Sequence, residues 1–182
     1  MGAAAPAIAD MDTPHLRGYG LHWTGPQLDV EWLKREGDQP YPVPLLPGGC
    51  LAMRRDTFEA VAGFDEGMIR VGSEDSEMSL RLWLLGYELR LAPGVEVAHL
   101  FRDEHPYPVA WGAVLHNELR IAFLHFAPQR IARVVEALHD YEGFAHGVAL
   151  TVESDVAARR SELRSRRVRD DDWFFRRFGP DW

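Results

Sequence analysis

The residues best suited to chemistry lie in two short stretches near the middle of the chain. The first is an acidic run, Gly72-Ser73-Glu74-Asp75-Ser76-Glu77, which opens an apolar helical pattern. Carboxylates at a helix start can accept hydrogen bonds from free backbone N–H groups, or they can take up a proton. The second stretch is Val97-Ala98-His99-Leu100-Phe101-Arg102. Its imidazole could bind a metal ion, and its guanidinium could pair with a phosphate or a carboxylate.

The elements between these stretches form a compact unit. Leu80, Trp83 and Leu84 continue the acidic run at helical spacing, and Gly86 is placed to end the helix. Two short strands should then lead to His99, and alternation places this histidine on the apolar face of the second strand. The sequence therefore predicts a helix-strand-strand unit that joins the acidic turn to the histidine.

Each of these residues also has a structural interpretation. A single histidine on an apolar face is often a hydrogen-bonded core residue and not a metal ligand. Trp83 fits a core position, Arg102 fits a structural ion pair, and Asp65, in the turn before the acidic run, fits a carboxylate that binds turn amides. Both interpretations stay open from the residues alone.

The pattern as a whole resembles the C-terminal half of the GT-A catalytic domain of glycosyltransferases. It is most similar to the polypeptide N-acetylgalactosaminyltransferases, and the β-1,4-galactosyltransferases and the family 2 bacterial glycosyltransferases are similar across the acidic turn. The resemblance covers about a third of the chain and is carried by Gly48-Gly49, Phe58, Gly63, Phe64-Asp65, Gly67-Met68, Gly72, Glu74-Asp75, Glu77, Ser79, Arg81, Trp83, Gly86, Pro93 and the stretch from Val97 to Arg102.

This resemblance implies an α/β fold, namely a partial GT-A-like mixed sheet of the nucleotide-diphospho-sugar transferase type with a C-terminal helical extension. It also implies transfer of a sugar from a nucleotide-sugar donor, such as a UDP-sugar, to a hydroxyl acceptor, which could be a glycan, a lipid-linked molecule or a small molecule. Asp75 matches the general base of the inverting relatives, so the resemblance favours inversion without deciding it.

The remaining site residues are carried over from the same motifs. Glu74 would bind the acceptor or orient Asp75, and His99 would complete a site for a divalent cation, Mn²⁺ or Mg²⁺. The residues expected to contact substrate are Gly48, Gly49, Trp83 and Arg102.

We expect three segments along the chain. Residues 1–44 should form an irregular or edge-lying N-terminal segment, residues 45–105 the acceptor and metal half, and residues 106–182 a helical extension. Helices are predicted over 109–126, from Pro128 onward and over about 144–167, with a loop over 103–108. Asp10-Met11-Asp12 has the spacing of the D-x-D motif, but Pro6 spoils a preceding strand, so we interpret it as chance or as a cap.

Composition limits the classes of function. The chain of 182 residues has a formal charge of −8, and its single cysteine, Cys50, excludes an internal disulfide. We expect a cytoplasmic protein and no nucleic-acid partner. From Ser154 to Trp182 eight arginines outnumber six acids, which gives +2 there and −10 in the rest. The aromatics of Trp173-Phe174-Phe175-Arg176-Arg177-Phe178 should pack on the domain or on a second subunit.

Enzymes of this type carry a nucleotide-binding half before the region that the resemblance covers. We therefore expect either a fragment of a longer enzyme, a chain that completes a donor site with a separate half or by homo-oligomerisation, or an inactive descendant. The competing hypothesis is a non-catalytic carbohydrate-binding or interaction module on the same scaffold.

Overall fold

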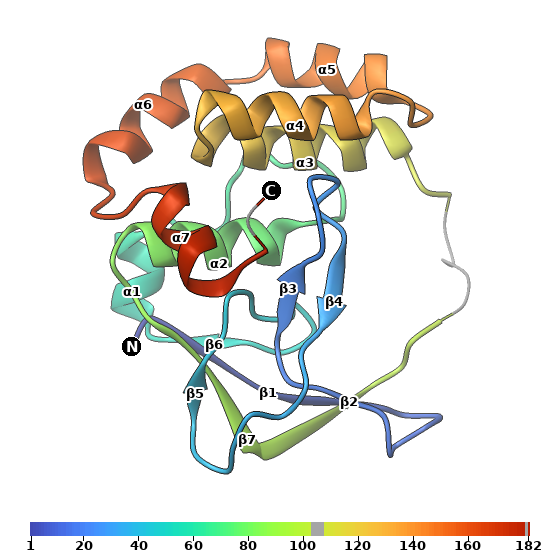
Figure 1. Ribbon diagram of the computed structural model, residues 1–182, viewed down its shortest axis with the longest axis vertical. Helices are drawn as coiled ribbons and strands as arrows, with labels where there is room; N and C mark the ends of the chain where they lie inside the picture. The colour runs from blue at the N-terminus through green and yellow to red at the C-terminus, as the bar shows by residue number, and fades with distance from the viewer. Residues whose placement is uncertain (103–107, 181) are drawn as a thin grey trace.

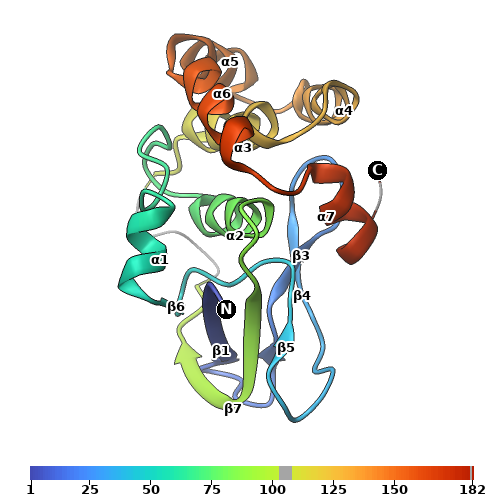
Figure 2. The same cartoon turned by 90° about the vertical axis from the view of Figure 1, so that its left-hand side faces the viewer.

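The computed structural model describes residues 1–102, 108–180 and 182 and arranges them in layers (Figure 1). A mixed sheet lies at one end, the helices α3 to α6 lie at the other, and α2 lies between them, as Figure 2 shows from the side. The strands are β1 (Ala3–Asp10), β2 (Arg17–Gly18), β3 (Leu21–Trp23), β4 (Val30–Trp32), β5 (Tyr41–Pro42), β6 (Ala52–Met53) and β7 (Leu89–His99). The helices are α1 (Arg55–Ala60), α2 (Glu74–Leu84), α3 (Trp111–His125), α4 (Pro128–Leu138), α5 (Phe144–Glu153), α6 (Val156–Arg166) and α7 (Asp171–Phe178).

The sheet is built around one parallel pair of strands. Its order is β2-β1-β7-β5, with β6 paired to β1, and β1 and β7 run parallel from Ala3 beside Leu89 to Asp10 beside His99. The strands β3 and β4 form a separate antiparallel pair. The predicted α/β class and mixed sheet are confirmed, and the two short strands predicted before His99 are one strand whose pairing shifts register midway.

The N-terminal prediction is wrong for residues 3–10. We expected an irregular or edge-lying segment, but β1 is a buried strand with a neighbour on each side. The register of the β1–β7 pair shifts between Pro6 and Ala7, and such an irregularity is a place where a strand tolerates a proline. The alanines of this strand have low strand propensity, so only the tertiary setting makes the segment a strand.

The helix α2 is the central element of the core. It begins at Glu74, and all residues from Ser76 to Leu84 are buried. Gly86 adopts a positive φ of 95° after the helix, which confirms its predicted role in ending it. Trp83 is 2 % exposed, and its indole N–H donates to the carbonyls of Val43 and Pro44.

The helical part follows the prediction with one exception. Helices are found over most of 109–126 and from Pro128, but the third predicted helix is two helices, α5 and α6. The break comes at Ser154, whose hydroxyl donates to the Thr151 carbonyl and accepts from the N–H of Val156, so that it competes with the helical backbone bonds. The loop predicted over 103–108 and the boundary predicted at 105/106 lie outside the described residues, apart from Pro108.

The aromatic cluster of α7 packs on the domain, as predicted. Phe174 and Phe175 are each 1 % exposed and lie against Trp23, with ring centroids 5.8 and 6.1 Å apart. Trp83 contacts Phe178 with ring centroids 5.0 Å apart. The C-terminal helix is therefore part of the same hydrophobic core as the sheet and α2. Among the described residues, no helix has both the length and the apolar character needed to cross a bilayer.

Candidate functional site

The acidic turn is held in place by its own backbone. Ser73, just before α2, has a left-handed φ of 64°, and Glu74 accepts a hydrogen bond from the N–H of Gly72 at 2.8 Å. Asp75 accepts from the N–H of Ser76 at 2.7 Å through Oδ1. Asp75 therefore satisfies one free N–H group in the first turn of the helix, as the sequence predicts, and Glu74 satisfies one in the turn before it.

The second oxygen of Asp75 reaches another part of the chain. Its Oδ2 accepts from the N–H of Gly48 at 2.7 Å. Burial raises the pKa of the Asp75 carboxyl, and the charge of Glu74 adds to this, whereas the hydrogen bonds from Gly48 and Ser76 act in the opposite direction. Asp75 is half-buried, and each carboxylate oxygen has a second lone pair, so the group can still accept a proton.

The glycine pair joins Asp75 to His99. A Cβ atom on Gly48 would lie 3.1 Å from Asp75 Oδ2, and one on Gly49 would lie 3.1 Å from His99 Cδ2. Neighbouring Cα atoms are about 3.8 Å apart, so the Asp75 carboxylate and the His99 imidazole both lie against the short Gly48–Gly49 backbone. The structure thus brings together four predicted site residues, Gly48, Gly49, Asp75 and His99.

His99 lies at the end of β7 with one nitrogen unsatisfied. Its Nδ1 is buried and has no hydrogen-bond partner among the described residues. The ring contacts Phe101, with centroids 4.5 Å apart. Among residues 1–102, 108–180 and 182, no group of three or more His, Cys, Asp or Glu side chains could hold a metal ion.

Asp10 lies beside His99 in the parallel pair but has a role in a turn. Its Oδ1 accepts from the N–H of Asp12 at 2.8 Å, and its Oδ2 accepts from the Thr13 hydroxyl at 2.7 Å. The interpretation of Asp10-Met11-Asp12 as a cap is confirmed, although the strand before it is present.

Two cavities border these residues. One of about 390 Å³ has walls that include Asp10, Trp32 and Phe101, so it begins next to His99. Trp32 and Phe101 are both partly exposed there, with ring centroids 6.0 Å apart. The other, of about 700 Å³, is mainly apolar and includes Val71 and Val114, next to the start of the acidic turn. Apolar and aromatic walls with a few polar groups are typical of small-molecule sites.

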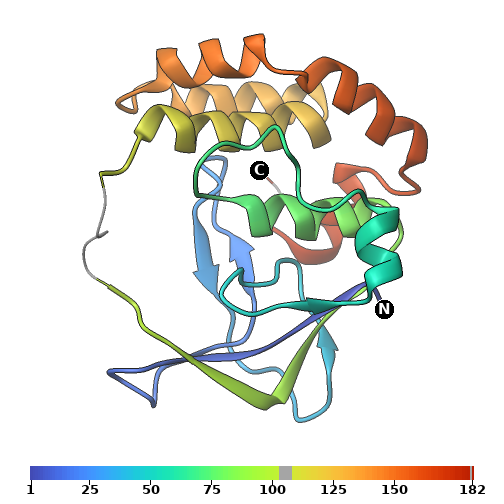
Figure 3. The same ribbon diagram turned by 180° about the vertical axis from the view of Figure 1, so that it is seen from behind.

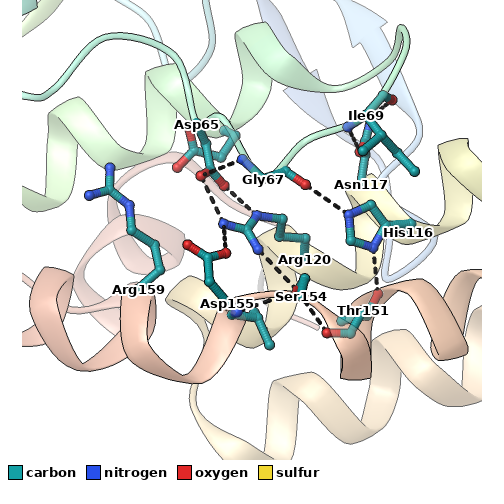
Figure 4. A network of polar contacts seen from close by, with 12 residues as sticks. Asp65, Gly67, Ile69, His116, Asn117, Arg120, Thr151, Ser154, Asp155 and Arg159 are labelled. Atoms are coloured by element: carbon teal, nitrogen blue, oxygen red, sulfur yellow. Dashed lines mark hydrogen bonds and ion pairs between the residues drawn. The ribbon is translucent and has the colours of Figure 1, made fainter.

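A polar network on α3 holds the loop that leads into the acidic turn (Figure 4). The Asn117 side chain donates to the carbonyls of Ile69 and Gly72 and accepts from the N–H of Ile69. His116 lies between the Gly67 carbonyl and the Thr151 hydroxyl, at 2.9 Å from each. Figure 3 shows this loop running up against α3.

Arg120 completes the network. It is fully buried and pairs with Asp65, which also accepts from the N–H of Gly67, and it reaches Asp155 at 2.8 Å. The structural interpretation of Asp65 is confirmed. Helical spacing in the sequence places three polar residues of α3 on one face: His116, Asn117 and Arg120. This pattern was the signal that a polar partner packs against that face.

The comparisons with known proteins agree with this arrangement. The family model described as "N-terminal domain of galactosyltransferase" matches residues 34–106. The chain is 41 % identical over 86 residues to a probable N-acetylgalactosaminyltransferase 8 of Caenorhabditis elegans, and 29 % identical over 164 residues to the human polypeptide N-acetylgalactosaminyltransferase 13. These alignments cover 46 % and 86 % of this chain but only 20 % and 27 % of the relatives.

A solved structure extends the likeness to nearly the whole fold. It is the crystal structure of GalNAc-T7 with UDP, GalNAc and Mn²⁺, which superposes with a TM-score of 0.71 at 17 % identity and covers 96 % of this chain and 34 % of that one. The fold is that of part of a GT-A-like domain. The chain spans about a fifth to a quarter of the length of the curated relatives it matches.

Within this GT-A-like fold the predicted site residues lie in three places. Five of them lie together at the mouth of α2, meaning its N-terminal end: Asp75, Glu74, His99, Gly48 and Gly49. Trp83 lies elsewhere, near the other end of α2, and its buried ring offers no surface to a substrate. The prediction that Trp83 contacts substrate is therefore wrong, because the indole fills the core. Arg102 is exposed beyond the end of β7.

Proposed function

We propose that this chain is the acceptor-binding and base-carrying half of a glycosyltransferase that moves a sugar from a nucleotide-sugar donor to a hydroxyl group. The observation that carries the proposal is the Gly48–Gly49 backbone, which lies against both the Asp75 carboxylate and the His99 ring. The GalNAc-transferase relatives and the neighbour solved with UDP favour a UDP-sugar, and UDP-N-acetylgalactosamine is the first donor to test.

Asp75 would act as the general base. The acceptor oxygen forms the new bond to the anomeric carbon, the bond from that carbon to the diphosphate breaks, and the hydroxyl proton passes to Asp75. A raised pKa makes the carboxylate a stronger proton acceptor, and the N–H groups of Gly48 and Ser76 fix its orientation. Glu74 would assist by holding the turn through Gly72. A single displacement of this kind inverts the anomeric carbon, so the assignment of Asp75 as the base favours inversion.

His99 fits the role of a single ligand to a divalent cation. Buried polar atoms nearly always have a partner, so the unpaired Nδ1 of His99 is consistent with a role in ligation. When bound, Mn²⁺ or Mg²⁺ would neutralise the charge that develops on the departing diphosphate. Since no group of three such ligands lies among the described residues, the ligands that complete the site would come from the donor and from a donor-binding half, in a longer chain or a partner.

The cavity that begins next to His99 would receive part of the substrate. Trp32 and Phe101 give it aromatic walls, and Asp10 and Arg17 give it polar groups. Arg102, exposed beside it, would pair with an anionic part of the donor. Gly48 and Gly49 would allow the sugar to approach the backbone closely, since side chains there would press on Asp75 and His99.

A thermal-shift titration with UDP, with and without Mn²⁺, tests the donor side. With the donor-binding half present, we expect stabilisation that needs both UDP and Mn²⁺, weakened in His99→Ala and retained in Asp75→Asn. Transfer from UDP-N-acetylgalactosamine to a serine- and threonine-containing peptide, measured with the donor-binding half present, should be lost in Asp75→Asn by roughly 10²- to 10⁴-fold. Transfer that survives this substitution would exclude Asp75 as the base.

The competing function is a non-catalytic carbohydrate-binding module. It is favoured by the incomplete metal site among the described residues and by the aromatic walls of the cavity beside His99. It predicts that the chain binds free glycans and that Trp32→Ala weakens this binding. It also predicts no stabilisation by UDP with Mn²⁺, and no sugar transfer for Asp75→Asn to reduce.

A further inference from the structure

An arginine-lined cavity lies at the far end of α2 from the acidic turn. It has a volume of about 440 Å³, and its walls include Arg164, Arg167, Arg169 and Arg176, with Asp170 and Trp173 between them. An α-helix rises about 1.5 Å per residue, so the eleven residues of α2 separate this cavity from the acidic turn by roughly 16 Å. The cavity is therefore not a part of the candidate site at the mouth of α2.

The fold holds two of these arginines in position. The Arg167 guanidinium donates to the His125 carbonyl at 3.0 Å, and that of Arg169 donates to the Trp83 carbonyl at 3.2 Å. Arg169 also lies 4.2 Å from the centre of the Trp173 ring. The N–H groups of Val168 and Arg169 both donate to the Leu84 carbonyl, which fixes the segment between α6 and α7 to the end of α2. Two guanidiniums are thus oriented before any ligand arrives.

The positive charge of the cavity is poorly neutralised. Within the described part of the chain, none of these four arginines forms an ion pair. Asp170 is the carboxylate in the wall, and its Oδ1 already accepts from the N–H of Trp173 at the start of α7. Arg164 and Arg176 are exposed and carry no hydrogen bond to a described residue. A cluster of this kind is unusual in a chain whose formal charge is −8.

The arginines also repel one another. Burial, followed by the charge of Arg164, lowers the pKa of Arg167, while Asp171 and Asp170 act in the opposite direction. Arg160, on the same helix as Arg164, has its pKa lowered by burial and then by Arg164 and Arg167. A bound anion would relieve this repulsion.

We propose that this cavity binds a phosphoryl anion, held by the guanidinium groups of Arg164, Arg167, Arg169 and Arg176. Guanidinium groups match phosphate oxygens with paired N–H donors, and several of them around one cavity favour a multiply charged group over a simple halide. The same chemistry is offered by a free diphosphate and by the phosphate headgroup of a lipid. This site is independent of the proposed transferase reaction.

Calorimetric titration with inorganic pyrophosphate at fixed ionic strength tests the site. We expect one saturable site, weakened about fivefold in Arg164→Gln and in Arg176→Gln, since an exposed charged contact contributes about 1 kcal/mol. The matched control is Arg55→Gln, which removes the same charge from an exposed arginine on α1. It should leave the affinity unchanged.

Vesicle binding separates the two sources of the phosphate. Vesicles of phosphatidylcholine with phosphatidic acid are compared with phosphatidylcholine alone, in the presence and absence of pyrophosphate. Binding that needs phosphatidic acid, depends on Arg164 and Arg176 and is displaced by pyrophosphate assigns a lipid headgroup. Pyrophosphate binding without vesicle binding assigns a free anion.

Three results would overturn the proposal. The first is a lack of binding to either probe. The second is a loss of pyrophosphate affinity in Arg55→Gln that equals the loss in the cavity variants. The third is binding that is unchanged in both Arg164→Gln and Arg176→Gln. Thermal melting of each variant checks the fold, and the two exposed positions provide independent tests should one variant be unstable.

Discussion

Asp75 and Glu77 lie two residues apart in the same acidic run, yet their surroundings differ completely. Glu77 is 0 % exposed, and its carboxylate pairs with Arg81 and His125, at 2.9 Å from each. Burial alone would raise its pKa, but the charges of Arg81 and His125 and their hydrogen bonds lower it to about 2. Asp75 is half-buried and has backbone N–H groups as partners, and its pKa is raised.

The difference separates a structural carboxylate from one that is available for chemistry. Glu77 is ionised because the Arg81 cation is buried beside it, and each of these two buried charges stabilises the other. Among the residues that the structure describes, no cation pairs with Asp75, and its proton affinity is correspondingly higher. Within the first turn of α2, Glu77 thus serves the core, whereas Asp75 faces the candidate site. The predictions below test this division, beginning with the largest expected effect.

The first prediction concerns the buried partner of Arg81. Glu77→Gln keeps the shape of the side chain but removes its charge, which leaves the buried Arg81 guanidinium with neutral acceptors, among them the carbonyls of Val61 and Gly63. We expect the free energy of unfolding to fall by about 3–5 kcal/mol, as is usual when one member of a buried ion pair is lost. Denaturant unfolding measures it.

Glu59→Gln is the matched control for this substitution. Glu59 pairs with Arg55 at the same i,i+4 spacing, but both side chains are largely exposed. Its loss should cost less than about 1 kcal/mol. Equal effects of the two substitutions would mean that the buried pair contributes no more than a surface pair.

The second prediction follows from the lowered pKa of Glu77. A carboxyl whose pKa is lower in the folded state stabilises the fold fully above its usual pKa of 4.5, and this contribution is lost as the pH falls toward about 2. The size of the shift corresponds to roughly 3 kcal/mol. Unfolding free energies measured across this pH range should show a slope in the wild type that is largely missing in Glu77→Gln. Parallel curves would assign the acid sensitivity to other carboxyls.

The third prediction concerns the loop that leads to Asp75. Asn117→Ala removes three hydrogen bonds to Ile69 and Gly72 and leaves their backbone groups without these partners. We expect a loss of about 1–3 kcal/mol in the free energy of unfolding, together with faster hydrogen exchange at residue 69. The control is Gln129→Ala, at an exposed position in the first turn of α4. Exchange that stays as slow as in the wild type would show that the loop is held by other contacts.

Much of this architecture could be predicted where local chemistry and fold agree. The start of α2, its end near Gly86, the helix from Pro128 and the docking of α7 all follow from caps, prolines and apolar periodicity. The grouping of Asp75, His99, Gly48 and Gly49 followed from motifs that resemble a family. Spacing alone does not say which residues of the loop after β5 reach the mouth of α2.

The errors have physical causes that a local pattern cannot reveal. β1 is a strand of small residues with an internal proline, and it is a strand only because β7 and β2 pair with it. The division between Asp75 and Glu77 depends on His125, which lies 48 residues after Glu77 in the chain. Burial and partners, which decide the pKa of a carboxyl, are set by such long-range contacts.

The smallest effect is expected for Asp75→Asn, and it sharpens the comparison most. The raised pKa means that the folded state disfavours the ionised carboxylate, so Asp75 stabilises the fold at low pH and loses this contribution as the pH rises through its raised pKa. Asparagine carries no such charge. Its side-chain amide offers one acceptor oxygen where Asp75 uses two, so one hydrogen bond from Gly48 or Ser76 is lost at a cost of about 1 kcal/mol, and the variant should improve relative to the wild type as the pH rises from acidic to neutral.

Denaturant unfolding of both proteins over that pH range measures the difference directly. A loss of several kcal/mol, as predicted for Glu77→Gln, would place Asp75 among the structural carboxylates. In that case a loss of transfer in Asp75→Asn would report a damaged fold and not a missing base. A loss of only about 1 kcal/mol in stability together with lost transfer is the combination expected of a catalytic carboxylate, because a carboxylate that only held the turn would affect transfer through the stability of the fold.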